Sequence, residues 1–148
     1  MDGEPVVESA AQILVLADLD PEGRLAPKIT DPARARYVHW LVTVPVSLEP
    51  MVMPIFNRIP TPGTAQKIKS AFEIQTRLFE GPYCVGHHLT AADIFLHWGL
   101  RLMAGKGALK DAPFWLDYLQ RLEPELSWAT LHPTKPGFLD DAGSVHIT

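Results

Sequence analysis

Apolar side chains recur at helical spacing along most of the 148-residue chain, and no segment alternates apolar with polar residues over more than a few positions. This pattern favours helices, because a helix returns to the same face about every 3.6 residues and a strand every second residue. No internal repeat is visible, which argues against a solenoid. At roughly 100 to 200 residues per domain, the length fits one domain. The sequence therefore predicts an all-α fold, a single helical bundle.

Fourteen prolines, nearly twice the usual share of about 5%, divide the helical pattern into segments. Each proline fixes its own backbone angle and disfavours helix in the residue before it. The expected helices cover residues 8–19, 34–44, 65–80, 89–104, 112–122 and 124–131. Ser9 is a possible cap for the first helix, and Asp31 and Pro32 can open the second. Pro45, Pro50 and Pro54 are expected to kink or break the chain that follows.

The clearest local signal lies at the start of the segment 89–104. Thr90 and Asp93 have the spacing of a capping box, in which each side chain satisfies a helix amide that would otherwise be unpaired. Leu89 and Ile94 occupy the hydrophobic-staple positions around it. The helix that follows is apolar around most of its circumference, which is typical of a helix surrounded by others. We interpret Thr90 and Asp93 as structural residues and this segment as the core helix.

Charge and cysteine content exclude several classes of protein. The chain has 13 basic and 17 acidic side chains, a net charge of -4, and no long basic cluster. Nucleic acid and an anionic membrane are therefore not expected as partners. No export signal is evident at the start, and no apolar run reaches the roughly 18 residues of a bilayer-spanning helix. Cys84 is the single cysteine, so no internal disulfide can form, and we expect a cytoplasmic protein.

The histidines are candidate metal ligands, and the cysteine is a candidate nucleophile. No ligand pair lies one helical turn apart with a third ligand beside it, so no metal site is predicted. His97 lies on the core helix, where a buried, hydrogen-bonded imidazole is the usual outcome. Cys84 lies in a short packed segment and is interpreted as a small apolar filler, although a thiolate with His87 as its base is the alternative.

Two further sets of residues remain open between a structural and a binding role. Tyr37, Trp40 and Val44 share one face of the second helix, where such aromatic stripes line an apolar pocket or, more often, form core. Glu8 and Ser9 place a carboxylate and a hydroxyl at the start of a helix, whose free amides and dipole favour an anion. Ser9 and the amides could hold the carboxylate of an amino-acid-like group and Glu8 its ammonium. Simple capping is the equal alternative.

The order of the motifs resembles the cytosolic glutathione transferase family. In order, the chain reads Asp2-Gly3, Glu8-Ser9, Gly23-Arg24-Leu25-Ala26-Pro27, Asp31-Pro32 with Arg34, Arg36, Tyr37, Trp40 and Leu41, and Gly86 with Leu89, Thr90, Ala92, Asp93 and Ile94. The match runs from about residue 2 to residue 128. It implies a remnant of a thioredoxin-like glutathione-binding domain at 1–9, a helical C-terminal domain at 10–132 and a flexible tail at 133–148.

The resemblance implies glutathione as a substrate and an apolar electrophile as its partner, in detoxification or small-molecule biosynthesis. Glu8 and Ser9 occupy the positions that hold the γ-glutamyl end, and Tyr37, Trp40 and Val44 are expected to line the electrophile pocket. The family's thiolate-activating residue lies earlier than this sequence begins, so no catalytic residue is assigned and enzyme activity is left open. Pro45 stands where relatives have an acidic residue.

The resemblance also leaves the partners open. A homodimer or a protein partner is expected. The alternative function is a non-catalytic helical interaction module, of the kind found in translation elongation factors.

Overall fold

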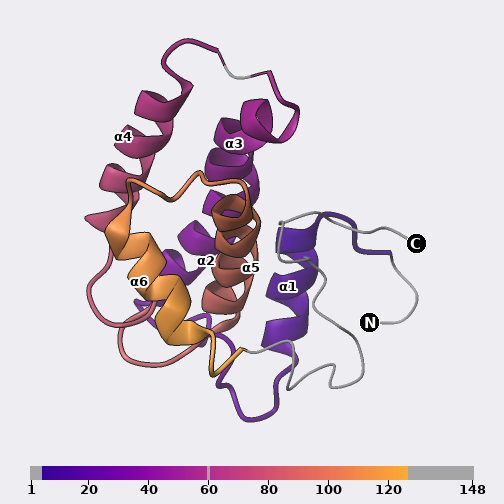
Figure 1. Ribbon diagram of the computed structural model, residues 1–148. Coiled ribbons are helices and arrows are strands. Elements are labelled where there is room, and N and C mark those ends of the chain that lie inside the picture. The colour runs from indigo at the N-terminus through magenta and orange to yellow at the C-terminus, as the bar shows by residue number, and fades with distance from the viewer. Residues whose placement is uncertain (1–4, 60, 127–148) are drawn as a thin grey trace.

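The computed structural model describes residues 5–59 and 61–126, and these form a bundle of helices (Figure 1). The elements are α1 (Ser9–Asp18), α2 (Arg34–Thr43), the π-helical turn η1 (Val44–Leu48), α3 (Glu49–Phe56), α4 (Thr64–Thr76), α5 (Ala91–Gly105) and α6 (Pro113–Leu122). The described residues contain no strand, only an isolated bridge between Tyr83 and Gly86. The all-α prediction is confirmed. The tail expected at 133–148 lies outside the described residues, as does most of the helix expected at 124–131.

Three helix ends can be compared with the boundaries expected from the sequence. Glu8, not Ser9, is the residue that precedes α1, and neither side chain makes a capping hydrogen bond among the described residues. Before α2, the Asp31 carboxylate accepts a hydrogen bond from the Ala33 amide at 2.8 Å, as expected of a cap, although the regular helix begins at Arg34. Helix α4 ends at Thr76, four residues earlier than its apolar stripe predicts.

The expected break at the prolines is not observed, because α2, η1 and α3 form one continuous helix from Arg34 to Phe56. Pro45 has no amide proton to donate, and the chain widens here into a π-helical turn. The Glu49 amide donates to the carbonyl of Val44, five residues back, which is the π-helical pattern. The prediction of a break is therefore wrong, since the wider turn accommodates the proline without ending the helix.

This continuous helix is long and apolar enough to cross a membrane by length and composition alone, with a mean hydropathy of 1.3 in its most apolar window. The core helix of a soluble protein passes the same test. Here the face that carries Tyr37, Trp40, Leu41 and Val44 is completely or almost completely buried in the bundle. Core packing therefore accounts for the apolar residues of this face, and 33% of the most apolar window is buried.

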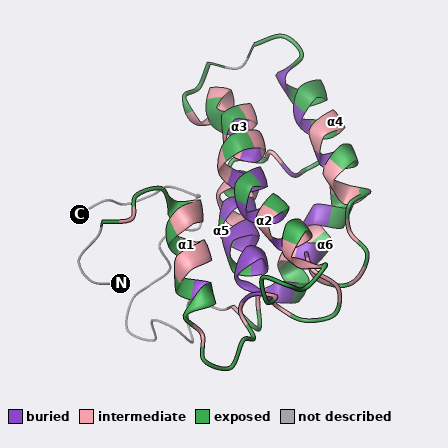
Figure 2. Ribbon diagram, turned by 180° about the vertical axis from the view of Figure 1, so that it is seen from behind, coloured by how far each residue is buried: buried purple, intermediate pink, exposed green. Residues whose placement is uncertain are grey.

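The core lies around α5, which packs against α1, α2, η1 and α6 (Figures 1 and 2). Figure 2 shows the buried residues on the faces that α2, α5 and α6 turn towards one another. Aromatic rings fill much of this space: Trp40, Phe79 and Trp115 meet edge to face, with ring centroids 4.8 to 6.2 Å apart. The close approach of α5 to η1 depends on Gly99, where a Cβ would lie 3.1 Å from a methyl carbon of Val44.

Candidate functional site

The strained start of α1 is the first candidate site. Glu8 has φ 72° and ψ 119°, a backbone conformation that residues other than glycine rarely adopt. Its carbonyl accepts the first bond of the helix, from the Gln12 amide at 3.0 Å, and the Gln12 side chain donates to the Val6 carbonyl at 2.8 Å. These two bonds hold the segment before the helix against its first turn.

The polar groups at this end are available to a ligand. Glu8 and Ser9 are both exposed, and neither side chain is committed to capping the helix within the described part of the chain. The amides of the first turn have no intrahelical partner, as at the start of any helix, and they point towards the same end. An anion there would meet the Ser9 hydroxyl and the positive end of the helix dipole.

The predicted pocket residues lie elsewhere, in the core. Tyr37, Trp40 and Val44 are each 0% exposed, so in this structure they line no surface that is open to a ligand. Burial raises the pKa of Tyr37 to about 12, which keeps its phenol neutral. The structure does not bring these three side chains to one surface with Glu8 and Ser9. Their burial fits the core interpretation, because the apolar face of α2 is the face that α5 covers.

Asp93 is the centre of a buried hydrogen-bond network that joins three segments of the chain. Its carboxylate is 0% exposed and accepts four hydrogen bonds, which come from the Thr90 amide and hydroxyl at 2.8 Å, the Cys84 amide at 2.7 Å and the Tyr118 hydroxyl at 2.7 Å. The capping box is therefore one part of a larger network. Sequence reasoning missed Tyr118 and the Cys84 amide, because no local spacing relates α6 or residue 84 to the cap.

The same network makes the side chains of Cys84 and Tyr118 unreactive. The Cys84 sulfur is buried and lies 3.4 Å from the Tyr118 hydroxyl oxygen. Burial, and then the nearby Asp93 carboxylate, raise the pKa of the Cys84 thiol well above its ordinary value. Burial likewise raises the pKa of the Tyr118 phenol. Both groups stay protonated at neutral pH, so neither supplies a nucleophile or a charged partner for one. This agrees with the interpretation of Cys84 as a filler.

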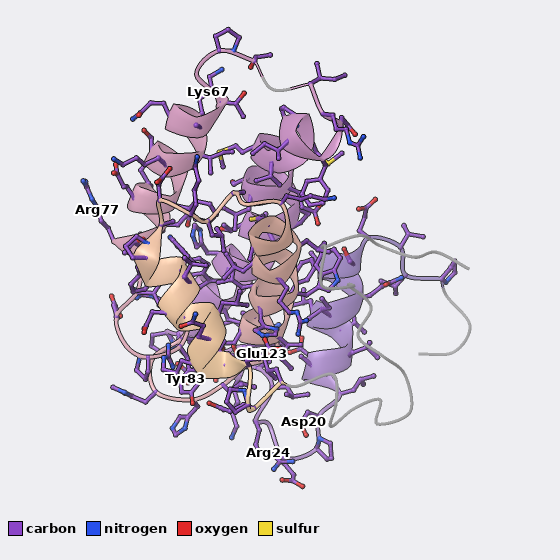
Figure 3. The ribbon with its side chains drawn as sticks, in the orientation of Figure 1. Asp20, Arg24, Lys67, Arg77, Tyr83 and Glu123 are labelled. Atoms are coloured by element: carbon purple, nitrogen blue, oxygen red, sulfur yellow. The ribbon has the colours of Figure 1, made fainter. Side chains whose placement is uncertain are left out.

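His97 is buried on α5, and its Nε2 lies 2.9 Å from a carboxylate oxygen of Glu123, at the end of α6 (Figure 3). Arg101 also bonds to Glu123. Burial lowers the pKa of His97, and the Glu123 carboxylate opposes that shift. The expected hydrogen-bonded imidazole is present. No group of three or more His, Cys, Asp or Glu side chains gathers to hold a metal ion among the residues that the structure describes.

The fold is shared with solved bacterial enzymes. BphK, a bacterial glutathione transferase solved as a ternary complex, superposes with a TM-score of 0.70 and 25% identity, over 82% of this chain and 64% of BphK. The chain has the glutathione transferase fold. A glutathione transferase from Actinobacillus pleuropneumoniae gives a TM-score of 0.66 and 24% identity, over 83% of this chain and 61% of that enzyme.

A third glutathione transferase, of the beta class and from Sphingomonas chungbukensis, gives a TM-score of 0.72 and 22% identity, over 90% of this chain and 71% of that protein. No family model and no curated protein matches the sequence. The resemblance to glutathione transferases is confirmed. This chain spans 64% and 61% of the length of the first two enzymes, and the domain boundaries expected after residues 9 and 132 stay a prediction.

Proposed function

We propose that this chain acts in the cytoplasm as part of a glutathione transferase, with Glu8 and Ser9 holding the γ-glutamyl end of glutathione. The observation that carries the proposal is the strained backbone of Glu8 at the exposed start of α1. Strain of this kind persists where the surrounding structure imposes it, and it is concentrated at ligand sites. The glutathione transferase fold supports the same ligand.

The γ-glutamyl group is an α-amino acid, and the start of α1 offers complementary groups for both of its charges. Its carboxylate would accept hydrogen bonds from the Ser9 hydroxyl and the free amides of the first turn. Its ammonium would pair with the Glu8 carboxylate, which lies next to Ser9 in the chain. The side chains of Glu8 and Ser9 therefore bind and orient the substrate and take no part in proton transfer.

Thiol activation needs a donor that stabilises the glutathione thiolate. Cys84 and Tyr118 cannot serve, because both side chains are buried and the Tyr118 hydroxyl already donates to Asp93. The proposal therefore gives the described residues a binding role, and an apolar electrophile is the second substrate of the proposed reaction.

The test is the affinity for glutathione, measured by calorimetry on the chain and four variants. Glu8→Gln and Ser9→Ala should each raise the Kd about tenfold, since the first removes the negative charge that pairs with the ammonium and the second removes a hydrogen bond to the carboxylate. Glu22→Gln and Ser70→Ala are the matched controls, because both residues lie away from the start of α1, and they should leave the Kd unchanged. Equal affinity in Glu8→Gln, Ser9→Ala and the parent would exclude this site.

A further inference from the structure

Gln12, in the first turn of α1, holds the segment that precedes the helix. Its side-chain Nε2 donates a hydrogen bond to the Val6 carbonyl at 2.8 Å, and its backbone amide donates to the Glu8 carbonyl at 3.0 Å. The strained φ of Glu8, 72°, lies between these two carbonyls. One residue therefore fixes the chain on both sides of the strained backbone.

Little else in the described structure holds this segment. Helix α1 lies at the edge of the bundle (Figure 1), and the side chain of Val7 is 72% exposed. Among residues 5–59 and 61–126, no further hydrogen bond to residues 5–8 is present. A positive φ in a residue other than glycine persists only where neighbouring groups impose it. In this part of the chain Gln12 is the residue that does so.

Neither core packing nor helix formation explains a glutamine at position 12. The residue is exposed, and methionine or glutamate has a similar helix propensity. What glutamine adds is an amide donor that reaches back to a carbonyl six residues earlier. The side chain of Gln12 therefore contributes to the shape of the start of α1.

We propose that Gln12 is a positioning residue for the γ-glutamyl group, because it keeps the Glu8 carboxylate and the Ser9 hydroxyl in the arrangement that receives the ligand. This inference rests on the function proposed above for Glu8 and Ser9. The Gln12 side-chain nitrogen is committed to Val6, so Gln12 acts through the backbone and does not bind the ligand itself. Without this bond, Glu8 would turn towards a negative φ and the two binding groups would leave their places.

Gln12→Met tests the effect on the backbone, because methionine keeps the length and the helix propensity of glutamine but lacks the donor. In the 15N-labelled parent, Glu8 should give the strong intraresidue NOE between its amide and Hα protons that a positive φ produces. The Gln12→Met variant should lose this NOE. Gln66→Met is the matched control and should keep it, since Gln66 is likewise an exposed residue in the first turn of a helix, α4. An NOE of equal strength in the parent and in Gln12→Met would overturn the proposal.

Calorimetry measures the consequence for binding. Gln12→Met should raise the Kd for glutathione and for γ-glutamylcysteine about threefold, the effect of one exposed neutral hydrogen bond. It should change the melting temperature no more than Gln66→Met does. In the Ser9→Ala background the same substitution should have a smaller effect, because the hydroxyl that it would displace is already absent.

The outcomes separate this role from the proposed function. If Ser9→Ala weakens binding and Gln12→Met does not, the positioning role is overturned and the proposed function stands. An undiminished effect of Gln12→Met in the Ser9→Ala background would also overturn the positioning role, since Gln12 would then act independently of Ser9. A parent that binds no glutathione would overturn both, even with the NOE of Glu8 intact.

Discussion

Asp93 fixes the start of α5 through one buried carboxylate that accepts four hydrogen bonds from Thr90, Cys84 and Tyr118. Removing this carboxylate would leave hydrogen-bond donors on three segments of the chain without an acceptor. Asp93→Ala should therefore lower the free energy of unfolding by about 3 kcal/mol or more, because buried donors would lose their acceptor. Thr90→Ala removes the hydroxyl of the cap, and about 1 kcal/mol is expected.

Denaturant unfolding of both variants tests this order. Ser70→Ala, a change outside this network, is the control and should stay within about 0.5 kcal/mol of the parent. A loss for Asp93→Ala no larger than that for Thr90→Ala would mean that the wider network contributes nothing beyond the cap.

Glu8 allows a second test of a single residue, because its positive φ reverses the usual ranking of the stabilities of the glycine and alanine variants. Removing the Cβ relieves the steric conflict, so Glu8→Gly should be more stable than Glu8→Ala by about 1 kcal/mol. Glu73, within α4, should show the opposite order, with glycine less stable than alanine by about 1 kcal/mol. Thermal melts of the four variants give the comparison. The same order at both positions would show that the backbone of Glu8 is not strained.

The helices differ in how far the sequence could predict them. The start of α5 was predicted from Thr90 and Asp93, because a capping box is a local interaction between residues three apart. The continuity of α2, η1 and α3 could not be predicted from the sequence, since it depends on a π-helical turn at Pro45 and on packing against α5. The spacing of Tyr37 is consistent with core, the more frequent outcome, and also with the wall of a pocket. Only the position of α5 decides between them.

The contact between η1 and α5 depends on the absence of a side chain at Gly99. Gly99→Val should lower the free energy of unfolding by about 1 to 3 kcal/mol, because the new methyl groups would collide with Val44. Val44→Ala alone should also destabilise the fold by leaving a cavity. In the double variant the alanine makes room for the valine, so the combined loss should be smaller than the sum of the two. Strict additivity in a double-mutant cycle would show that these residues do not meet.

Exposed apolar residues on two packed helices bear on the state of the whole molecule. Leu16 of α1, Leu19 directly after it, and Ile94 and Trp98 of α5 are all more than one third exposed. Large exposed apolar patches mark interaction sites. We expect the 148-residue chain to self-associate, and size-exclusion chromatography with light scattering measures this. Replacing Ile94 and Trp98 by Gln should shift it towards monomer, whereas a parent that is a monomer at all concentrations would contradict the expectation.

Binding of the γ-glutamyl end of glutathione at the start of α1 can be tested by the amide chemical shifts of the labelled chain. Glutathione and γ-glutamylcysteine should shift the resonances of Ser9, Ala10 and Ala11, and cysteinylglycine, which lacks the γ-glutamyl group, should leave them in place. Shifts of these three amides with cysteinylglycine as strong as those with glutathione, or no shift with any of the three compounds, would contradict the claim.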